Sequence, residues 1–168
     1  SLDMHAAPGS QGVTLGITDG FYPNNLWDYP VFQDVLVEIW DAISDRYRDE
    51  SRIAMYEFIN EPNSVPGGGP AIRDLTQRLI TMVRAKGDQH LIGVHGNGYS
   101  NVYDNMLPQD FSPNWGLVYH AHRYWIELQD DAIPNGNPNV INRMVDLVQF
   151  RQTHQVPIWV SETGENSN

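Results

Sequence analysis

The sequence predicts an α/β fold, with about five parallel strands and flanking helices in a single domain covering residues 1–168. Segments with apolar residues at helical spacing alternate with short apolar runs, which is the order expected of βα units. The short runs are almost continuously apolar, as in parallel strands that are covered on both faces. No internal repeat, low-complexity tract or linker divides the chain.

The first half of the chain contains a strand end, a helix and a second strand. Residues 1–5 have the pattern of a strand that is already ending. Apolar residues at helical spacing predict a helix over 36–47, and Pro30 can occupy the first turn of the same helix. Residues 53–59 form a short β-prone run, which Pro62 stops.

The second half continues this alternation. Residues 72–83 predict an amphipathic helix, and Gly87 follows as the residue that ends it. Short strands are expected at 91–94, 116–122 and 157–161. Another helix precedes the last strand, with an apolar face made of Ile141, Met144, Val145 and Val148.

The composition excludes several classes of function. Lys and Arg total 10 and Asp and Glu total 21, so the formal net charge is −11. Nucleic acids and anionic membranes are therefore not expected as partners, whereas a neutral substrate is compatible with this charge. The absence of cysteine excludes disulfides, zinc–thiolate sites and thiol nucleophiles. No apolar run approaches the roughly 18 residues that a membrane span needs.

Two glutamates occupy positions at which α/β proteins build active sites. Glu61 and Glu162 each follow an apolar strand run, and active sites of (β/α)₈ proteins lie at the carboxyl ends of the strands. Cleavage of a glycosidic bond requires such a pair, one residue as general acid/base and the other as nucleophile or base. A single glutamate at a strand end is more often a solvated carboxylate or a helix cap, so the neighbouring residues have to show whether it is catalytic.

Alternation along the strands gives two further expectations. Residues two apart on a strand share a face, which groups His120 with His122 and Tyr124, and groups Glu162 with Ile158 and Val160. His120 and His122 could form the His-x-His metal pair of an amidohydrolase-like barrel, but the carboxylate partners that such a site needs are not visible. We therefore interpret His120 as a hydrogen-bonded core residue.

Two tryptophans and one loop complete the set of candidates. Trp40 and Trp115 lie within or beside apolar segments, so both are expected in the core. His95, Asn97 and Tyr99 follow the strand at 91–94, where a position in a cleft and turn formation by neighbouring glycines explain the segment equally well. Both interpretations stay open for this loop.

Four segments can be compared with a known family: Leu2–Gln11, Asn60-Glu61-Pro62, Tyr119–Trp125 and Pro157–Glu162. Together, and in this order, they resemble glycoside hydrolase family five, the cellulase family of clan A. The first is similar to the end of strand three of that family's barrel, and the second to the acid/base motif of strand four. The third is similar to strand six with its His-x-Tyr pair, and the last to strand seven with the nucleophile.

The resemblance implies a partial (β/α)₈ TIM barrel, from about strand three to strand seven. It implies a retaining β-glycosidase, in the first place an endo-β-1,4-glucanase (cellulase), with Glu61 as acid/base and Glu162 as nucleophile. Their carboxyl groups are then expected about 5–5.5 Å apart. The Arg of strand two and the Trp of strand eight, which help form the family's site, lie outside the matched strands.

The resemblance also implies residues that bind the substrate, a β-linked oligo- or polysaccharide. Asn60 would hydrogen-bond the sugar 2-hydroxyl, while His5, His122 and Tyr124 would orient the sugar and the nucleophile. Trp125 would provide a platform on which a pyranose ring stacks. No metal or organic cofactor is required, and the family implies a secreted bacterial enzyme.

A partial barrel has a second interpretation, as a non-catalytic remnant that binds glycans weakly and hydrolyses nothing. A closed barrel has no free sheet edge, whereas about five strands leave two. The interior residues expected to be exposed there are Phe58, Val118, Ile158 and Val160, and each exposed side chain forgoes roughly 1.5–3 kcal/mol. The chain is therefore predicted to form a homo-oligomer through its open barrel edges.

Overall fold

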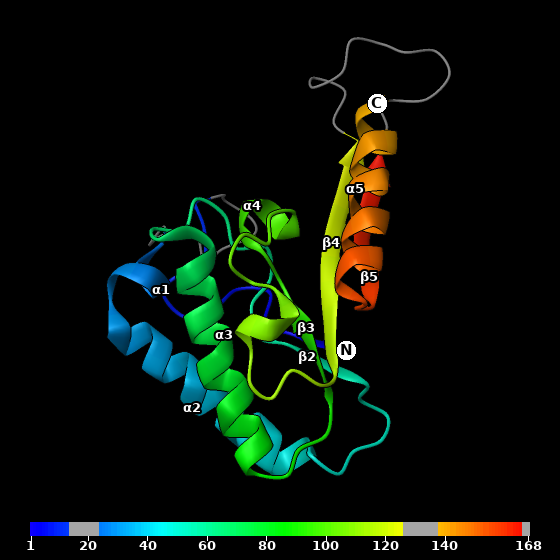
Figure 1. Ribbon diagram of the computed structural model, residues 1–168. Helices are drawn as coiled ribbons and strands as arrows, with labels where there is room; N and C mark the ends of the chain where they lie inside the picture. Colours follow the sequence, from blue (N-terminus) through cyan, green and yellow to red (C-terminus); the bar gives the residue numbers. More distant parts are fainter. Residues whose placement is uncertain (14–23, 126–137, 166–168) are drawn as a thin grey trace.

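The computed structural model describes residues 1–13, 24–125 and 138–165, which form one five-stranded parallel sheet with helices beside it (Figure 1). The strands pair in chain order from β1 to β5. Their bounds are β1 Leu2–Asp3, β2 Met55–Glu57, β3 Leu91–Val94, β4 Leu117–Trp125 and β5 Ile158–Glu165. The predicted α/β class and parallel order are confirmed, and the sheet is an open half-barrel.

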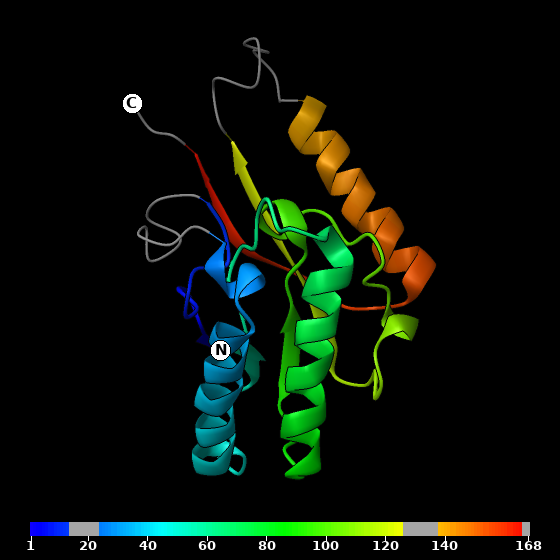
Figure 2. The same ribbon diagram turned by 90° about the vertical axis from the view of Figure 1, so that its left-hand side faces the viewer.

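Helices connect the consecutive strands. They are α1 Asn25–Asp28, α2 Pro30–Tyr47, α3 Gly68–Ala85, α4 Asn97–Ser100 and α5 Pro138–His154, with a 3-10 turn at Pro108–Asp110. The long helices α2 and α3 lie side by side against one face of the sheet, and α5 runs along β4 (Figure 1, Figure 2). Within the described residues, no helix is long and apolar enough to cross a membrane.

The two faces of the sheet differ in polarity. The register places Tyr56, Ile92 and Leu117 in one row across the strands, and all three are buried in the apolar core under the helices. Because successive strand residues point to opposite faces, the next row faces the interior of the half-barrel. That row contains polar as well as apolar residues, namely Asp3, Glu57, Gly93 and Val118.

The long helices form as the sequence predicts. Pro30 occupies the first turn of α2, where its missing N–H costs nothing. Gly87 follows the end of α3 with φ +77°, and its N–H donates to the carbonyl of Arg84. The apolar stripe of α3 is buried against the sheet and consists of Ile72, Leu75, Leu79 and Val83.

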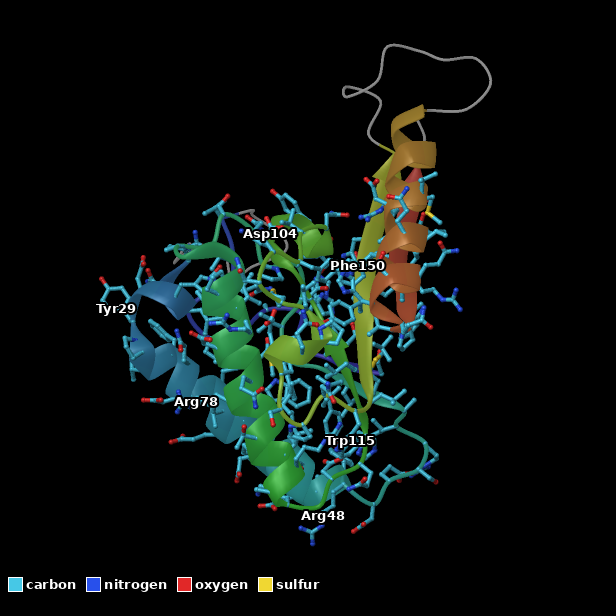
Figure 3. The ribbon with its side chains drawn as sticks, in the orientation of Figure 1. Tyr29, Arg48, Arg78, Asp104, Trp115 and Phe150 are labelled. Carbon is cyan, nitrogen blue, oxygen red and sulfur yellow. The ribbon has the colours of Figure 1, made fainter. Side chains whose placement is uncertain are left out.

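The helix α5 packs through a different face from the predicted one. Three residues of the predicted face are exposed: Met144, Val145 and Val148. Leu147 is buried instead, and Phe150 packs on Tyr119 of β4 with ring centroids 5.1 Å apart (Figure 3). The helix has apolar residues on two sides, and the side with the large aromatic ring meets the sheet. Ile141 lies outside the residues whose side chains are described.

Two further predictions about burial are wrong. Trp115 is exposed, and its ring covers the guanidinium group of Arg84 with Cζ 3.7 Å from the ring centroid (Figure 3). Phe58 and Val118 are buried rather than exposed in an open interior. Phe58 packs on Trp40 of α2, because the alternation of β2 turns this ring toward the helices.

Candidate active site

The segment after β2 holds the first predicted catalytic residue in a strained backbone conformation. Glu61 has φ +45°, a region that costs a residue other than glycine roughly 1–3 kcal/mol. Two amide side chains fix the segment: Asn63 Nδ2 donates to the Glu61 carbonyl at 3.2 Å, and Gln11 Nε2 donates to the Asn60 carbonyl at 2.8 Å. Strain of this kind persists where surrounding contacts impose it, and it clusters at functional sites.

Glu61 meets the second predicted carboxylate, Glu162, beside His122 of β4. His122 Nδ1 lies 2.5 Å from Glu61 Oε1 and 3.6 Å from Glu162 Oε2. One oxygen of each glutamate and one nitrogen of the imidazole all lie within 4.8 Å of one another. The side chain of Glu61 is 7% exposed and that of Glu162 is 28% exposed. The first carboxylate is therefore sheltered by protein, and the second is open to solvent.

An irregularity in the pairing of β4 with β5 aims Glu162 into this cluster. The register is regular as far as Val160 and resumes with Glu162 opposite His122, so Ser161 is an extra residue in β5. The predicted grouping of Glu162 with Ile158 and Val160 is therefore wrong. Those two residues are half-buried on the helix-facing side of the strand, whereas the bulge turns Glu162 to the interior.

A second polar cluster is buried in the half-barrel next to the glutamates. Glu57 Oε2 lies 3.2 Å from both His95 Nε2 and His120 Nδ1. His120 Nδ1 is also 2.9 Å from the hydroxyl of Ser161, and the hydroxyl of Ser100 is 2.7 Å from His95 Nδ1. The interpretation of His120 as a hydrogen-bonded core residue is thus confirmed.

Burial and hydrogen bonding decide the charge of this second cluster. Burial, together with the neighbouring His95, lowers the pKa of His120 to about 3, although Glu57 opposes the shift. Burial alone would raise the pKa of Glu57, but the hydrogen bond from His95 and the neighbouring histidines lower it to about 2. At neutral pH, Glu57 is therefore an ionised carboxylate hydrogen-bonded to His95, and His120 is neutral.

Acidification is expected to destabilise the fold below about pH 6.5. An unfolded chain takes up a proton on His120 near pH 6.5 and on Glu57 near pH 4.5, whereas both stay deprotonated in the folded chain. The unfolded state then binds more protons, so the unfolding free energy falls as the pH is lowered, by roughly 4 kcal/mol between pH 7 and pH 4. Urea unfolding at several pH values measures this loss. A midpoint that is equal or higher at pH 4 contradicts the expectation.

The histidines gather closely enough to test for metal binding. One nitrogen from each of His95, His120 and His122 lies within 4.8 Å of the others. A zinc ligand points its in-plane lone pair at an ion roughly 2.0–2.1 Å away. The rings of His95 and His120 are tilted against each other, with centroids 4.4 Å apart and planes inclined by 32°. A nitrogen of each ring lies 3.2 Å from Glu57 Oε2, so contacts with this carboxylate account for the placement of these two histidines.

The other predicted binding residues differ in their placement. Asn60 is buried, and its Nδ2 has no hydrogen-bond partner among the described residues. His5 follows β1 in the chain. Its side chain is more than half exposed, and its Nδ1 lies 2.9 Å from the Asp3 carboxylate. Tyr124 and Trp125 belong to β4, but their side chains lie outside the described residues. One cluster thus brings together Glu61, His122 and Glu162, with Asn60 next to Glu61 in the chain.

Two residues of this region, Glu57 and Ser161, were not predicted from the sequence. Glu57 could have been found, because it is the one charged residue in the apolar run 53–59. Ser161 has no such signal, since its position depends on the bulge. His95 is buried, and its ring meets that of His122 edge-on with centroids 5.5 Å apart.

Comparison with protein families gives a match along nearly the whole chain. The family model described as Cellulase (glycosyl hydrolase family 5) matches residues 2–168. A β-xylosidase of Phanerodontia chrysosporium is 27% identical over 127 residues, which cover 73% of this chain and 25% of that protein. The chain thus spans about a quarter of the length of this relative.

Several solved structures share the fold. XacCel5A in complex with cellopentaose superposes with a TM-score of 0.72 at 18% identity, over 99% of this chain and 53% of that one. Endoglucanase Cel5A of Pseudomonas stutzeri gives 0.71 at 21% identity, over 97% and 50%. Thermotoga maritima Cel5A in complex with mannotriose gives 0.66 at 18% identity, over 83% and 51%. The chain spans about half the length of each.

The family match, the half-barrel and the ordered motifs agree with one another. Each motif lies on its own parallel strand or directly after it, and the two glutamates that the motifs identify meet beside His122. The chain therefore belongs to the cellulase family, glycosyl hydrolase family 5.

Proposed function

We propose that the chain carries the catalytic pair of a retaining β-glycosidase, with Glu61 as general acid/base and Glu162 as nucleophile. The observation that carries this proposal is their spacing, because one oxygen of each lies within 4.8 Å of the other. Retaining glycosidases hold the two carboxyl groups about 5–5.5 Å apart, whereas inverting enzymes leave roughly 6.5–9.5 Å for a water molecule. The short spacing supports retention.

The reaction consists of two displacements at the anomeric carbon. In the first, Glu61 gives a proton to the glycosidic oxygen while an oxygen of Glu162 attacks, so the bond to the leaving group breaks and a glycosyl ester of Glu162 forms. In the second, Glu61 takes a proton from water, whose oxygen attacks the same carbon and releases Glu162. His122, with Nδ1 2.5 Å from one carboxylate and 3.6 Å from the other, is placed to orient both.

The substrate class that we propose is β-1,4-linked glucan, cleaved in the endo mode. An endoglucanase and a complex with cellopentaose among the structural neighbours support this choice. The buried amide of Asn60, whose Nδ2 has no partner within the described part of the chain, is suited to donate to a sugar hydroxyl. A polymer of this kind is degraded outside the cell, so we propose a secreted enzyme. Activity found in the lysate and absent from the culture medium would contradict secretion.

Glu61→Gln is expected to lower hydrolysis of carboxymethyl-cellulose by about 10²–10⁴-fold, because the amide cannot protonate the leaving oxygen. Release of reducing ends measures this loss. Glu38→Gln, at an exposed position of α2, makes the same chemical change away from the site and should leave the rate unchanged. Equal rates in the parent chain and in Glu61→Gln would remove Glu61 from the mechanism, and a first product of α configuration would exclude retention.

The 168-residue chain is also proposed to self-associate. In the described sheet, β1 and β5 are each paired on one side only, and Trp159 of β5 is exposed. Unpaired strand edges with apolar residues favour pairing with another chain. Light scattering after size-exclusion chromatography should give a mass that is a multiple of 19.1 kDa. Trp159→Lys should shift the chain toward the monomer. Tyr29→Lys, on the distant α1–α2 turn, is the control and should leave the mass unchanged. A stable monomer of the parent chain would contradict this proposal.

A further inference from the structure

Three buried side chains next to the catalytic pair have no part in the proposed chemistry. They are Glu57 of β2, His95 after β3 and His120 of β4, and together they are named the imidazole layer. Glu57 Oε2 is 3.2 Å from a ring nitrogen of each histidine, and all three residues are buried. A buried carboxylate is costly unless its partners are well placed. These contacts are therefore needed to keep a charge at this position.

The layer reaches Glu61 through His122. In the described part of the chain, His122 Nε2 has no hydrogen-bond partner, while Nδ1 bonds Glu61 at 2.5 Å. Nδ1 also lies 3.6 Å from Glu162 Oε2, and the ring packs against His95, which meets it edge-on at an interplanar angle of 86°. His95 is itself held from two sides, by the hydroxyl of Ser100 at 2.7 Å and by Glu57 at 3.2 Å. The orientation of His122 thus depends on His95.

The layer reaches Glu162 through Ser161. His120 Nδ1 lies 3.2 Å from Glu57 Oε2 and is hydrogen-bonded to the Ser161 hydroxyl at 2.9 Å. Ser161 is the extra residue of the bulge and directly precedes Glu162. A bulge re-aims the side chains that follow it. A hydrogen bond from the layer therefore holds the strand irregularity that turns Glu162 to the interior.

The packing around the layer leaves no room for a side chain at position 93 of β3, which is a glycine. A Cβ placed on Gly93 would lie 2.7 Å from His120 Nε2 and 2.9 Å from Glu57 Cγ, both of which are side chains held in place by other contacts. The layer is therefore a fitted arrangement of polar groups across neighbouring strands, β2 to β5.

We propose that the imidazole layer positions both reacting carboxylates, with Glu57 as the shared anchor: His95 orients His122 and thereby Glu61, and His120 holds the bulge and thereby Glu162. This inference rests on the proposed function, since it concerns the same two glutamates. A displacement of about 1 Å at a reacting group costs roughly 10²-fold in rate. Loss of the anchor should therefore lower kcat, while KM changes little because Asn60 and the open face of the site are untouched.

The test compares four variants by their kcat and KM on an aryl β-cellobioside. Glu57→Gln keeps the shape of the anchor without its charge. His120→Leu removes the hydrogen bond to Ser161 and the contact with Glu57. Each variant should lower kcat by about 10–100-fold with KM within two-fold. His120→Asn keeps an amide nitrogen near the place of Nδ1 and should recover most of the loss. His90→Leu is the control, since His90 is a buried histidine paired with Asp88 outside the layer, and its kcat should equal that of the parent.

A second readout does not depend on turnover. The imidazole ¹⁵N resonances of His122 should shift in Glu57→Gln and in His120→Leu, and they should stay in place in His90→Leu. If the parent chain hydrolyses nothing, the proposed function fails, while a shift of the His122 resonances still supports the positioning role. A kcat within two-fold of the parent in both layer variants overturns the inference, as do unshifted His122 resonances in an inactive parent.

Discussion

Glu162→Ala is expected to abolish turnover of every substrate that the chain hydrolyses, with a loss of about 10⁴-fold or more. Alanine leaves no oxygen that can form the glycosyl ester, so the first displacement has no nucleophile. Glu61 cannot take over, because it acts on the leaving-group oxygen and is bonded to His122. Release of the aryl group from an aryl β-cellobioside measures the loss, with Thr163→Ala, an exposed neighbour in β5, as the control.

Azide distinguishes a missing nucleophile from a damaged site. The anion fits the space that the Glu162 carboxylate leaves, and it attacks the anomeric carbon in its place. Cleavage should then recover in part, and the product should be a glycosyl azide of inverted configuration because one displacement replaces two. Full activity of Glu162→Ala without azide would assign the nucleophile to another residue.

The meeting of Glu61 and Glu162 was predictable because their signals are local. Glu61 stands between Asn60 and Pro62, and Glu162 ends an apolar run, so strand-end motifs identify both without knowledge of the packing. The alternation of helical and strand patterns likewise predicts parallel βα units. Parallel strands then bring their carboxyl ends to one edge, which is how residues about 100 positions apart come within 4.8 Å of each other.

The errors concern features that only tertiary contacts decide. The bulge at Ser161 has no sequence signal, and it reverses the alternation that places Glu162 with Val160. The helix α5 has apolar residues on two sides, and packing of Phe150 on Tyr119 selects one of them. Periodicity reports that a helix is amphipathic, but the neighbouring strand determines which face it covers.

Trp40 and Trp115 were both expected in the core, but only Trp40 is buried, so their substitutions should differ in their effect on stability. Trp40→Ala should lower the unfolding free energy by about 3–5 kcal/mol, a large part of the roughly 5–15 kcal/mol of a whole domain. The ring is 1% exposed and packs on Tyr56 and Phe58 at centroid distances of 5.3 and 5.1 Å. Its N–H also donates to the Phe58 carbonyl at 3.1 Å, which the substitution leaves without a donor. Urea unfolding measures the loss.

Trp115→Ala is the matched control, because it removes the same side chain from a position that is 43% exposed. Its main contact is the Arg84 guanidinium, a cation–π interaction of about 0.5–1 kcal/mol at an exposed site. Arg84 keeps its hydrogen bonds to the carbonyls of Asp88 and His90 without the ring. The expected loss is therefore about 1 kcal/mol, and the difference between the two variants measures burial rather than loss of an indole. Similar losses in both would mean that α2 does not cover β2 through Trp40, and the layer order of the half-barrel would have to be revised.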